Sequence, residues 1–373
     1  MDECGRRRAF GGMSRAPVET GRVSVRLLHM TTESRADQLL SSPLGRELLL
    51  NLIDRRDYTD WSAGHDWSTE PKVREAVRAA AARPPLPTNA LDFLLALERR
   101  TFIFGFMGYE WLWRLTKSMT DELRPVAQDV VAAVAPYGWW EPVERTDQRL
   151  LLWDGQPEVV GDGIEALVRD GVERARAENE EGSARHRPRH GQRNVGAAWW
   201  SPLSFAPLTW TTRHVPPLPS VALLPFFDTF RPFEPTGARV FALEIDPSAH
   251  VYEVNGPEDW RCLVEAFPMD VTGTHDGEWR RWGDVTGPWC LPDWSAVMER
   301  YDGVHVSVGG YVASCGLALP VGDAYTMLSA WIPDATFWLR DVALDRCLLG
   351  RWQGNPTSGS AELLLSGWRP ADG

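Results

Sequence analysis

Apolar residues recur every three or four positions from residue 34 to residue 135, the spacing that places side chains on one face of a helix. A helix is predicted to begin at Pro43, with the hydroxyl of Ser42 as its cap. Further helices are predicted over residues 91–117, 121–135 and 162–177.

From Trp199 onward the pattern changes to short apolar stretches separated by glycine and proline, which is typical of strands. Two short helices are predicted to start at Pro257 and Pro292, each with acidic residues in its first turn. Strands are predicted over residues 22–29, 238–245, 249–254, 303–308, 311–319, 325–331 and 336–341.

These elements predict an α+β fold with a helical N-terminal domain and a C-terminal domain built on a mixed, mainly antiparallel sheet. The polar run that follows residue 177 is the best candidate for a linker. We therefore divide the chain into a disordered leader (1–22), a helical domain (23–177), a linker (178–196) and an α+β domain with an aromatic pocket (197–373).

The formal net charge of -12 disfavours an extended nucleic-acid or membrane surface, because such surfaces rest on clustered lysine and arginine. The five cysteines form no C-x-x-C pair, and no histidine lies at metal-ligand spacing, so no metal is expected. The low, odd cysteine count and an N-terminus without an apolar signal segment predict a cytoplasmic protein.

Several common catalytic signatures are absent from the sequence. It contains no phosphate-binding P-loop, no G-x-G-x-x-G after a strand, no H-E-x-x-H and no G-x-S-x-G. This argues against P-loop nucleotidases, dinucleotide oxidoreductases, zincin proteases and α/β-hydrolases, but enzymes with scattered sites remain possible.

The segment from Trp199 to Arg213 is the strongest candidate site, because it opens the part of the chain that holds 12 of the 19 tryptophans. An indole can stack on a planar ring, hydroxyls can bind ligand hydroxyls, and an arginine can pair with a phosphate or carboxylate. The alternative is a sheet edge packed by aromatics, with the hydroxyls completing turns. The candidate binding residues are Trp199, Trp200, Ser201, Ser204, Thr211 and Arg213.

Two further residues are candidates for catalysis. His29 ends the first predicted strand and could orient a ribose or act as a base; alternatively it bonds to backbone, or Thr31 and Thr32 cap the next helix. Glu362 lies in a late strand pattern and could stabilise a cationic sugar, the alternative being a strand glutamate that faces water.

A second histidine, His305, alternates with valines and is expected on one side of a strand. We expect a carboxylate to satisfy it, with Asp302 and Asp284 as the options, and a catalytic role is the less favoured interpretation.

Three pieces in order resemble the ADP-ribosyltransferase superfamily: a strand ending in Leu27-Leu28-His29-Met30-Thr31, an aromatic-serine strand at Trp200-Ser201, and a late strand with Glu362. The strand pair between residues 240 and 254 also resembles the sheet that follows the serine motif in that superfamily. The resemblance implies NAD as cofactor, with His29 at the ribose, Trp200 and Ser201 at the nicotinamide, and Glu362 as the catalytic residue.

The sequence departs from that pattern at several points. It reads Trp-Ser-Pro-Leu-Ser where Ser-Thr-Ser is expected, and no Glu/Gln-x-Glu pair lies near Glu362. The leading hypothesis is an NAD- or nucleotide-binding enzyme that cleaves the nicotinamide glycosidic bond, with a protein as one option for the acceptor. The alternatives are a non-catalytic interaction protein and a tailoring enzyme without a recognisable motif.

Overall fold

The computed structural model describes residues 31–53, 70–82, 86–87, 89–104, 115–185, 200–203, 209–224, 237–353 and 369–371. Within these ranges the chain mixes helices with one large sheet, as the α+β prediction requires. The predicted leader, the predicted strand over residues 22–29 and four candidate residues lie outside them: His29, Trp199, Ser204 and Glu362.

The first part of the described chain is helical, as its periodicity predicts. Thr31 caps the first helix by accepting from the backbone N–H of Ser34, which confirms the capping alternative for that residue. Ser42 caps the next helix in the same way through Gly45. The helices are α1 (Thr32–Ser41), α2 (Pro43–Ile53), α3 (Glu70–Ala82), α4 (Ala90–Phe104), α6 (Thr120–Val134) and the short η1 (Ala135–Tyr137).

Eight described strands form one sheet in the order β12-β11-β3-β1-β2-β10-β7-β4. Neighbouring strands are antiparallel except β4 and β7, which run parallel. The strands are β1 (Gln148–Trp153), β2 (Trp210–Thr212), β3 (Gly237–Ile245), β4 (Val251–Val254), β7 (Gly303–Val306), β10 (Thr336–Trp338), β11 (Ala343–Gln353) and β12 (Arg369–Pro370).

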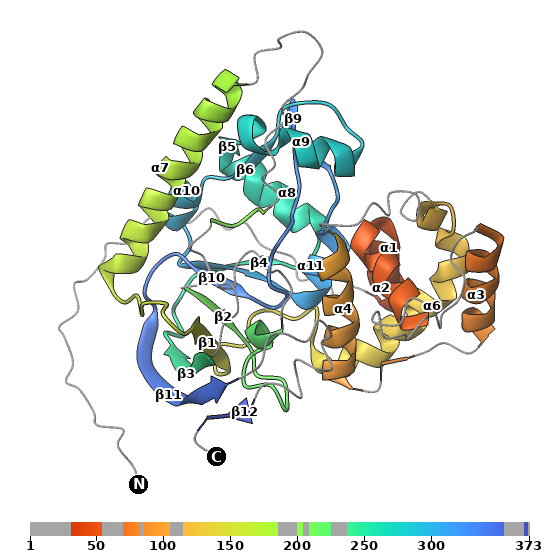
Figure 1. The fold of residues 1–373 in the computed structure, drawn as a ribbon, viewed down its shortest axis with the longest axis horizontal. Helices are drawn as coiled ribbons and strands as arrows, with labels where there is room; N and C mark the ends of the chain where they lie inside the picture. The colour runs from red at the N-terminus through yellow and green to blue at the C-terminus, as the bar shows by residue number, and fades with distance from the viewer. Residues whose placement is uncertain are drawn as a thin grey trace.

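Figure 1 shows the helical region on one side of the sheet and the long helix α7 on the other. Two small two-stranded sheets, β5 (Pro268–Asp270) with β6 (Cys290–Pro292) and β8 (Leu319–Val321) with β9 (Ala324–Thr326), are separate from the main sheet. The remaining helices are α7 (Asp162–Arg185), η3 (Val221–Leu223), α8 (Pro257–Ala266), α9 (Thr272–Gly283), α10 (Trp294–Met298) and α11 (Val308–Ser314).

The boundary predicted between the helical domain and the α+β domain needs two corrections. Strand β1 lies in the segment assigned to the helical domain, yet it occupies the middle of the sheet between β3 and β2. Helix α7 continues to Arg185, so residues 178–185 are helical and do not belong to a linker. One continuous hydrophobic core also joins the two regions, with Leu39, Val130, Val312 and Trp331 all belonging to it.

Helix α7 extends through these polar residues because its end packs closely on α9. A Cβ on Gly182 would lie 2.3 Å from the carbonyl oxygen of Gly273, and one on Gly273 would lie 2.2 Å from the carbonyl oxygen of Asn179. The Asn179 side chain accepts a 2.7 Å hydrogen bond from the Gly273 N–H. Tertiary contact thus overrides a composition that favours a linker.

The prediction of a strand over residues 311–319 is wrong, because α11 begins just before it. Ser307 caps this helix by accepting a 3.0 Å hydrogen bond from the Gly310 N–H. A Cβ on Gly310 would lie 2.2 Å from the Val254 carbonyl oxygen, so the helix can approach β4 only with glycine there. The valines and tyrosine that suggest a strand are instead buried on all sides of a core helix.

Among the described residues, no helix combines the length and the apolar character needed to cross a membrane.

Candidate functional site

A cavity of about 130 Å³ lies beside the tryptophan and serine that open the predicted aromatic site. We call it the tryptophan cavity. Its walls come from α7, the segment 200–203, the β5–β6 strand pair and the starts of α9 and α10. It is lined by Gly171, Arg174, Ala175, Glu178, Trp200, Ser201, Pro202, Leu203, Met269, Val271, Thr274, His275, Leu291 and Trp294.

Trp200 and Ser201 contribute to the cavity in different ways. The indole of Trp200 is half-buried against the core and lines the cavity. The Ser201 hydroxyl is already used, since it donates to the Met327 carbonyl at 2.8 Å and accepts from the Ser329 N–H at 2.8 Å. Ser201 therefore fixes the segment in place, and Trp200 is the residue with a surface to offer a ligand.

The segment around Trp200 is not the strand that the sequence pattern suggests. Residues 200–203 form a bend, and Pro202 has no N–H to donate to a strand ladder. The strands β3 and β4, which follow one another in the chain, are separated in the sheet by four other strands. Of the strands that the resemblance names, β3 and β4 are thus present in the sheet, whereas residues 200–203 are not a strand.

His275 holds the Trp200 backbone from the opposite wall. Its Nε2 lies 3.1 Å from the Trp200 carbonyl oxygen, and its Nδ1 lies 2.8 Å from the Thr274 hydroxyl. Burial lowers the pKa of His275 to about 4, so the ring is neutral at pH 7. A neutral ring that donates from Nε2 accepts at Nδ1, and both nitrogens are then satisfied within the protein.

Trp294 forms a fully buried part of the cavity wall. Its ring packs edge-on against Phe337, with centroids 5.2 Å apart, and tilted against Trp331. Its Nε1–H is buried and has no hydrogen-bond acceptor among the described residues. An indole N–H is a donor only, so this group lacks the partner that a buried donor normally has.

Two charged residues from one face of α7 line the outer part of the cavity. Arg174 and Glu178 are four residues apart and exposed, so they carry opposite charges one helical turn from each other. The cavity therefore combines apolar aromatic walls with a polar rim, the composition of a small-molecule site.

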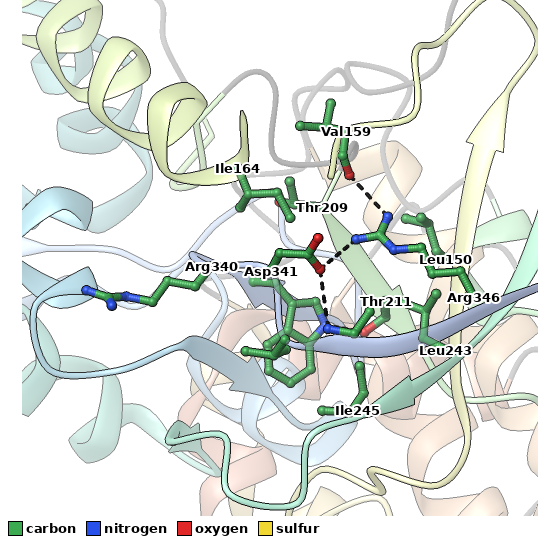
Figure 2. A pocket seen from close by; sticks show the side chains of 13 residues that line it. Leu150, Val159, Ile164, Thr209, Thr211, Leu243, Ile245, Arg340, Asp341 and Arg346 are labelled. Atoms are coloured by element: carbon green, nitrogen blue, oxygen red, sulfur yellow. Dashed lines mark hydrogen bonds and ion pairs between the residues drawn. The ribbon is translucent and has the colours of Figure 1, made fainter. Parts of the chain in front are cut away.

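Thr211 lies away from the tryptophan cavity, on the interior strand β2. Its hydroxyl bonds to the Gln148 side chain and accepts from Trp338 Nε1 at 2.8 Å. It lines a second cavity of about 20 Å³, shown in Figure 2, which is only large enough for about one water molecule. At the margin of this cavity, the Asp341 carboxylate accepts a hydrogen bond from Arg346 at 2.7 Å. The Thr211 hydroxyl is thus bonded to the Gln148 and Trp338 side chains within the sheet.

Arg213 lies in a third location, in a cluster we call the charge network: Arg213, Glu253, His305 and Asp334. The Arg213 guanidinium makes two contacts with the Asp334 carboxylate, Nε to Oδ2 at 2.7 Å and Nη2 to Oδ1 at 2.6 Å. It also stacks over Trp139, 5.1 Å from the ring centroid. This arginine is thus paired inside the protein and does not face the tryptophan cavity.

His305 lies between the two carboxylates of the charge network. Its Nδ1 is 2.6 Å from Glu253 Oε2, and its Nε2 is 3.6 Å from Asp334 Oδ1. Burial lowers the pKa of His305, but the two carboxylates outweigh this and raise it to about 9. The strand position was predicted correctly, but Asp302 and Asp284, the expected partners, are not the residues that satisfy it.

Asp334 has a left-handed backbone conformation, with φ of 66°, and is almost fully buried. Burial would raise the pKa of its carboxyl, but His305 and Arg213 lower it below its usual range. The charge network is therefore neutral overall when His305 is protonated, with two positive and two negative groups. It ties together β4, β7, the end of β2 and the turn before β10.

The described candidate residues thus separate into three places: Trp200 and Ser201 at the tryptophan cavity, Thr211 inside the sheet, and Arg213 in the charge network. Sequence reasoning missed His275 and Trp294, which lie 75 and 94 residues after Trp200. The acidic helix start at residues 292–294 was noted, but nothing in its pattern shows that its tryptophan faces a cavity. Among the described residues no group of three or more His, Cys, Asp or Glu side chains is arranged to hold a metal ion.

Comparisons with protein-family models, with curated proteins and with solved structures gave no match.

Proposed function

We propose that this protein binds a nucleotide-type ligand through a planar ring held in the tryptophan cavity, with NAD as the leading candidate. The observation that carries the proposal is an aromatic-walled cavity beside Trp200, the residue that the sequence marks as a ring-stacking surface. A half-buried indole next to open space is the arrangement that a stacked base needs.

The size of the cavity limits the part of the ligand that can enter. A cavity of roughly 150 Å³ holds one benzene ring, so about 130 Å³ suits a single ring. Pockets for whole drug-sized ligands are larger, on the order of 300–1,000 Å³. The ribose and phosphates of a nucleotide would therefore lie outside, past the rim formed by Arg174 and Glu178.

Catalysis is the narrower part of the proposal. An enzyme that cleaves the nicotinamide glycosidic bond would hold the leaving base against Trp200 and place a carboxylate near the sugar. We propose Glu362 for that carboxylate and His29 for the ribose contact; both residues lie outside the described ranges.

Calorimetric titration with nicotinamide, adenine and NAD tests the binding proposal. Trp200→Ala should weaken binding of the ring roughly ten-fold or more, because a base stacked on an aromatic side chain contributes about 1–3 kcal/mol. Trp352→Ala is the matched control, since Trp352 is also half-buried but lies on β11 and does not line the cavity.

Absence of saturable binding of all three compounds would refute the proposal. If NAD binds, release of nicotinamide measures turnover, and Glu362→Gln should abolish turnover without weakening binding. Full turnover in that variant would remove Glu362 from the mechanism.

A non-catalytic interaction protein is the second candidate, favoured by the surface of β11. This strand carries three leucines that are 47–61% exposed: Leu344, Leu348 and Leu349. Val160, two residues before the start of α7, is 54% exposed. The strand also has two irregularities in its pairing with β3, at Leu344 and Leu349. Such bulges discourage unintended strand pairing, so this surface is the weaker candidate site.

A further inference from the structure

Buried indole N–H groups that have no hydrogen-bond acceptor among the described residues include those of Trp139, Trp140, Trp289 and Trp294. A buried donor without a partner loses its hydrogen bonds to water and gains none in the protein, which destabilises the fold. Each such group therefore requires an explanation. Trp294 differs from the other three because it also lines the tryptophan cavity.

We propose that the Trp294 Nε1–H determines the specificity of the tryptophan cavity by donating to an acceptor on the buried edge of the ligand ring. This inference rests on the proposed binding function and names the chemical class of ring that the cavity takes. The ligand is a planar ring with a ring nitrogen or a carbonyl oxygen at its inner edge, and carbocyclic rings of the same shape are disfavoured.

The other polar groups of the inner wall are already engaged. The His275 nitrogens bond to the Trp200 carbonyl and the Thr274 hydroxyl, and the Ser201 hydroxyl bonds to backbone. The single hydroxyl proton of Thr274 has two acceptors within reach, His275 Nδ1 at 2.8 Å and the Val271 carbonyl at 3.1 Å. A ring without an acceptor would leave the Trp294 donor unpaired, whereas a ring with one would satisfy it.

The depth of the two tryptophans fixes which edge of the ring carries the acceptor. Trp294 is fully buried, and Trp200 is half-buried, so the donor lies on the inner side and the stacking surface reaches outward. Arg174 and Glu178 are exposed at the rim and suit the polar remainder of the ligand. Pyridine, pyrimidine and purine rings, and rings with a carboxamide, all have this chemistry.

Pyridine and benzene are the probes that test the inference, because they share a shape and differ in one acceptor. Binding of each is measured by calorimetry to the full-length wild type and to the variants Trp294→Phe and Trp289→Phe. Trp289 is the matched control: it is fully buried with an unpartnered N–H but does not line the cavity.

The preference for pyridine over benzene should fall roughly ten-fold or more in Trp294→Phe and stay unchanged in Trp289→Phe. An equal preference in the wild type and in Trp294→Phe, with both rings binding, overturns the inference and leaves the binding function intact. Failure of both rings to bind the wild type also overturns the inference, and the titration with nicotinamide, adenine and NAD decides the binding function separately.

A spectroscopic measurement on the wild type covers the case in which Trp294→Phe does not fold. Indole-¹⁵N spectra should show one N–H proton that exchanges slowly with solvent in the presence of pyridine but not of benzene. Equal protection by both rings, or protection by neither at saturation, contradicts donation to the ligand.

Discussion

Two histidines in this protein are almost equally buried and have opposite protonation. His275, beside the tryptophan cavity, bonds to a hydroxyl and a backbone carbonyl, and burial lowers its pKa to about 4. His305, in the charge network, lies between two carboxylates that raise its pKa to about 9 against the effect of burial.

The difference shows that burial alone does not decide the charge of a histidine. A neutral partner leaves the desolvation penalty unopposed, so the ring loses its proton. A neighbouring carboxylate offsets the desolvation penalty because it stabilises the imidazolium. The imidazole of His275 beside the cavity is therefore neutral. The imidazolium of His305 is part of a buried cluster of charged side chains.

The largest expected effect comes from removing one charge of the network. Asp334→Asn keeps the shape of the side chain, and asparagine tolerates the left-handed backbone found there. It removes the carboxylate from both Arg213 and His305 and leaves Glu253 beside His305. Breaking a buried ion pair in this way costs about 3–5 kcal/mol of unfolding free energy, measurable by urea denaturation at pH 7.

The control for this experiment is Asp323→Asn, an exposed carboxylate in the β8–β9 turn. It should change the unfolding free energy by less than about 0.5 kcal/mol. An equally small change in Asp334→Asn would show that the network adds nothing to stability.

The next effect is a loss of stability at alkaline pH through His305. Its pKa is raised on folding, from 6.5 to about 9, so its contribution is complete below pH 6.5 and disappears as the pH rises through 9. The amount is about 3 kcal/mol, from roughly 1.4 kcal/mol per pKa unit. The measurement is the unfolding free energy of wild type minus that of His305→Gln at pH 6 and pH 9.5.

That subtraction removes the background titration of other groups. The difference between the two proteins should shrink as the pH rises. A difference that stays constant or grows would mean that His305 is not charged in the folded protein.

The smallest of these effects is expected at acidic pH through His275. Its pKa is lowered on folding, so the unfolded chain takes up the proton first, and stability falls as the pH drops below 6.5 toward 4. Between pH 6.5 and pH 5 the loss is about 2 kcal/mol. His275→Gln should lack this part of the pH dependence, and an unchanged profile in the variant would contradict a neutral buried ring.

Elements that depend on local signals could be predicted from the sequence. The cap at Ser42, the proline start at Pro257 and the periodicity over residues 121–135 each led to a helix that the structure contains. Segments that depend on distant contacts could not: residues 311–319 have strand propensity, but glycines at 309 and 310 let a helix pack into the core.

The same limit applies to the site. Trp200 could be singled out because neighbouring tryptophans and hydroxyls are visible in the sequence. The partners of His305 are 52 residues before it and 29 residues after it, and only the parallel pairing of β4 with β7 and the turn before β10 bring them together. A local sequence pattern does not show which distant residues the fold brings together.

The contact between Gly182 and Gly273 has a consequence for the dimensions of the tryptophan cavity. These two residues, without side chains, set how closely the end of α7 approaches α9, and the same two helices supply facing walls of the tryptophan cavity. A methyl group at either position would push the two helices apart and enlarge the tryptophan cavity, so its dimensions depend on two residues that are not part of its lining.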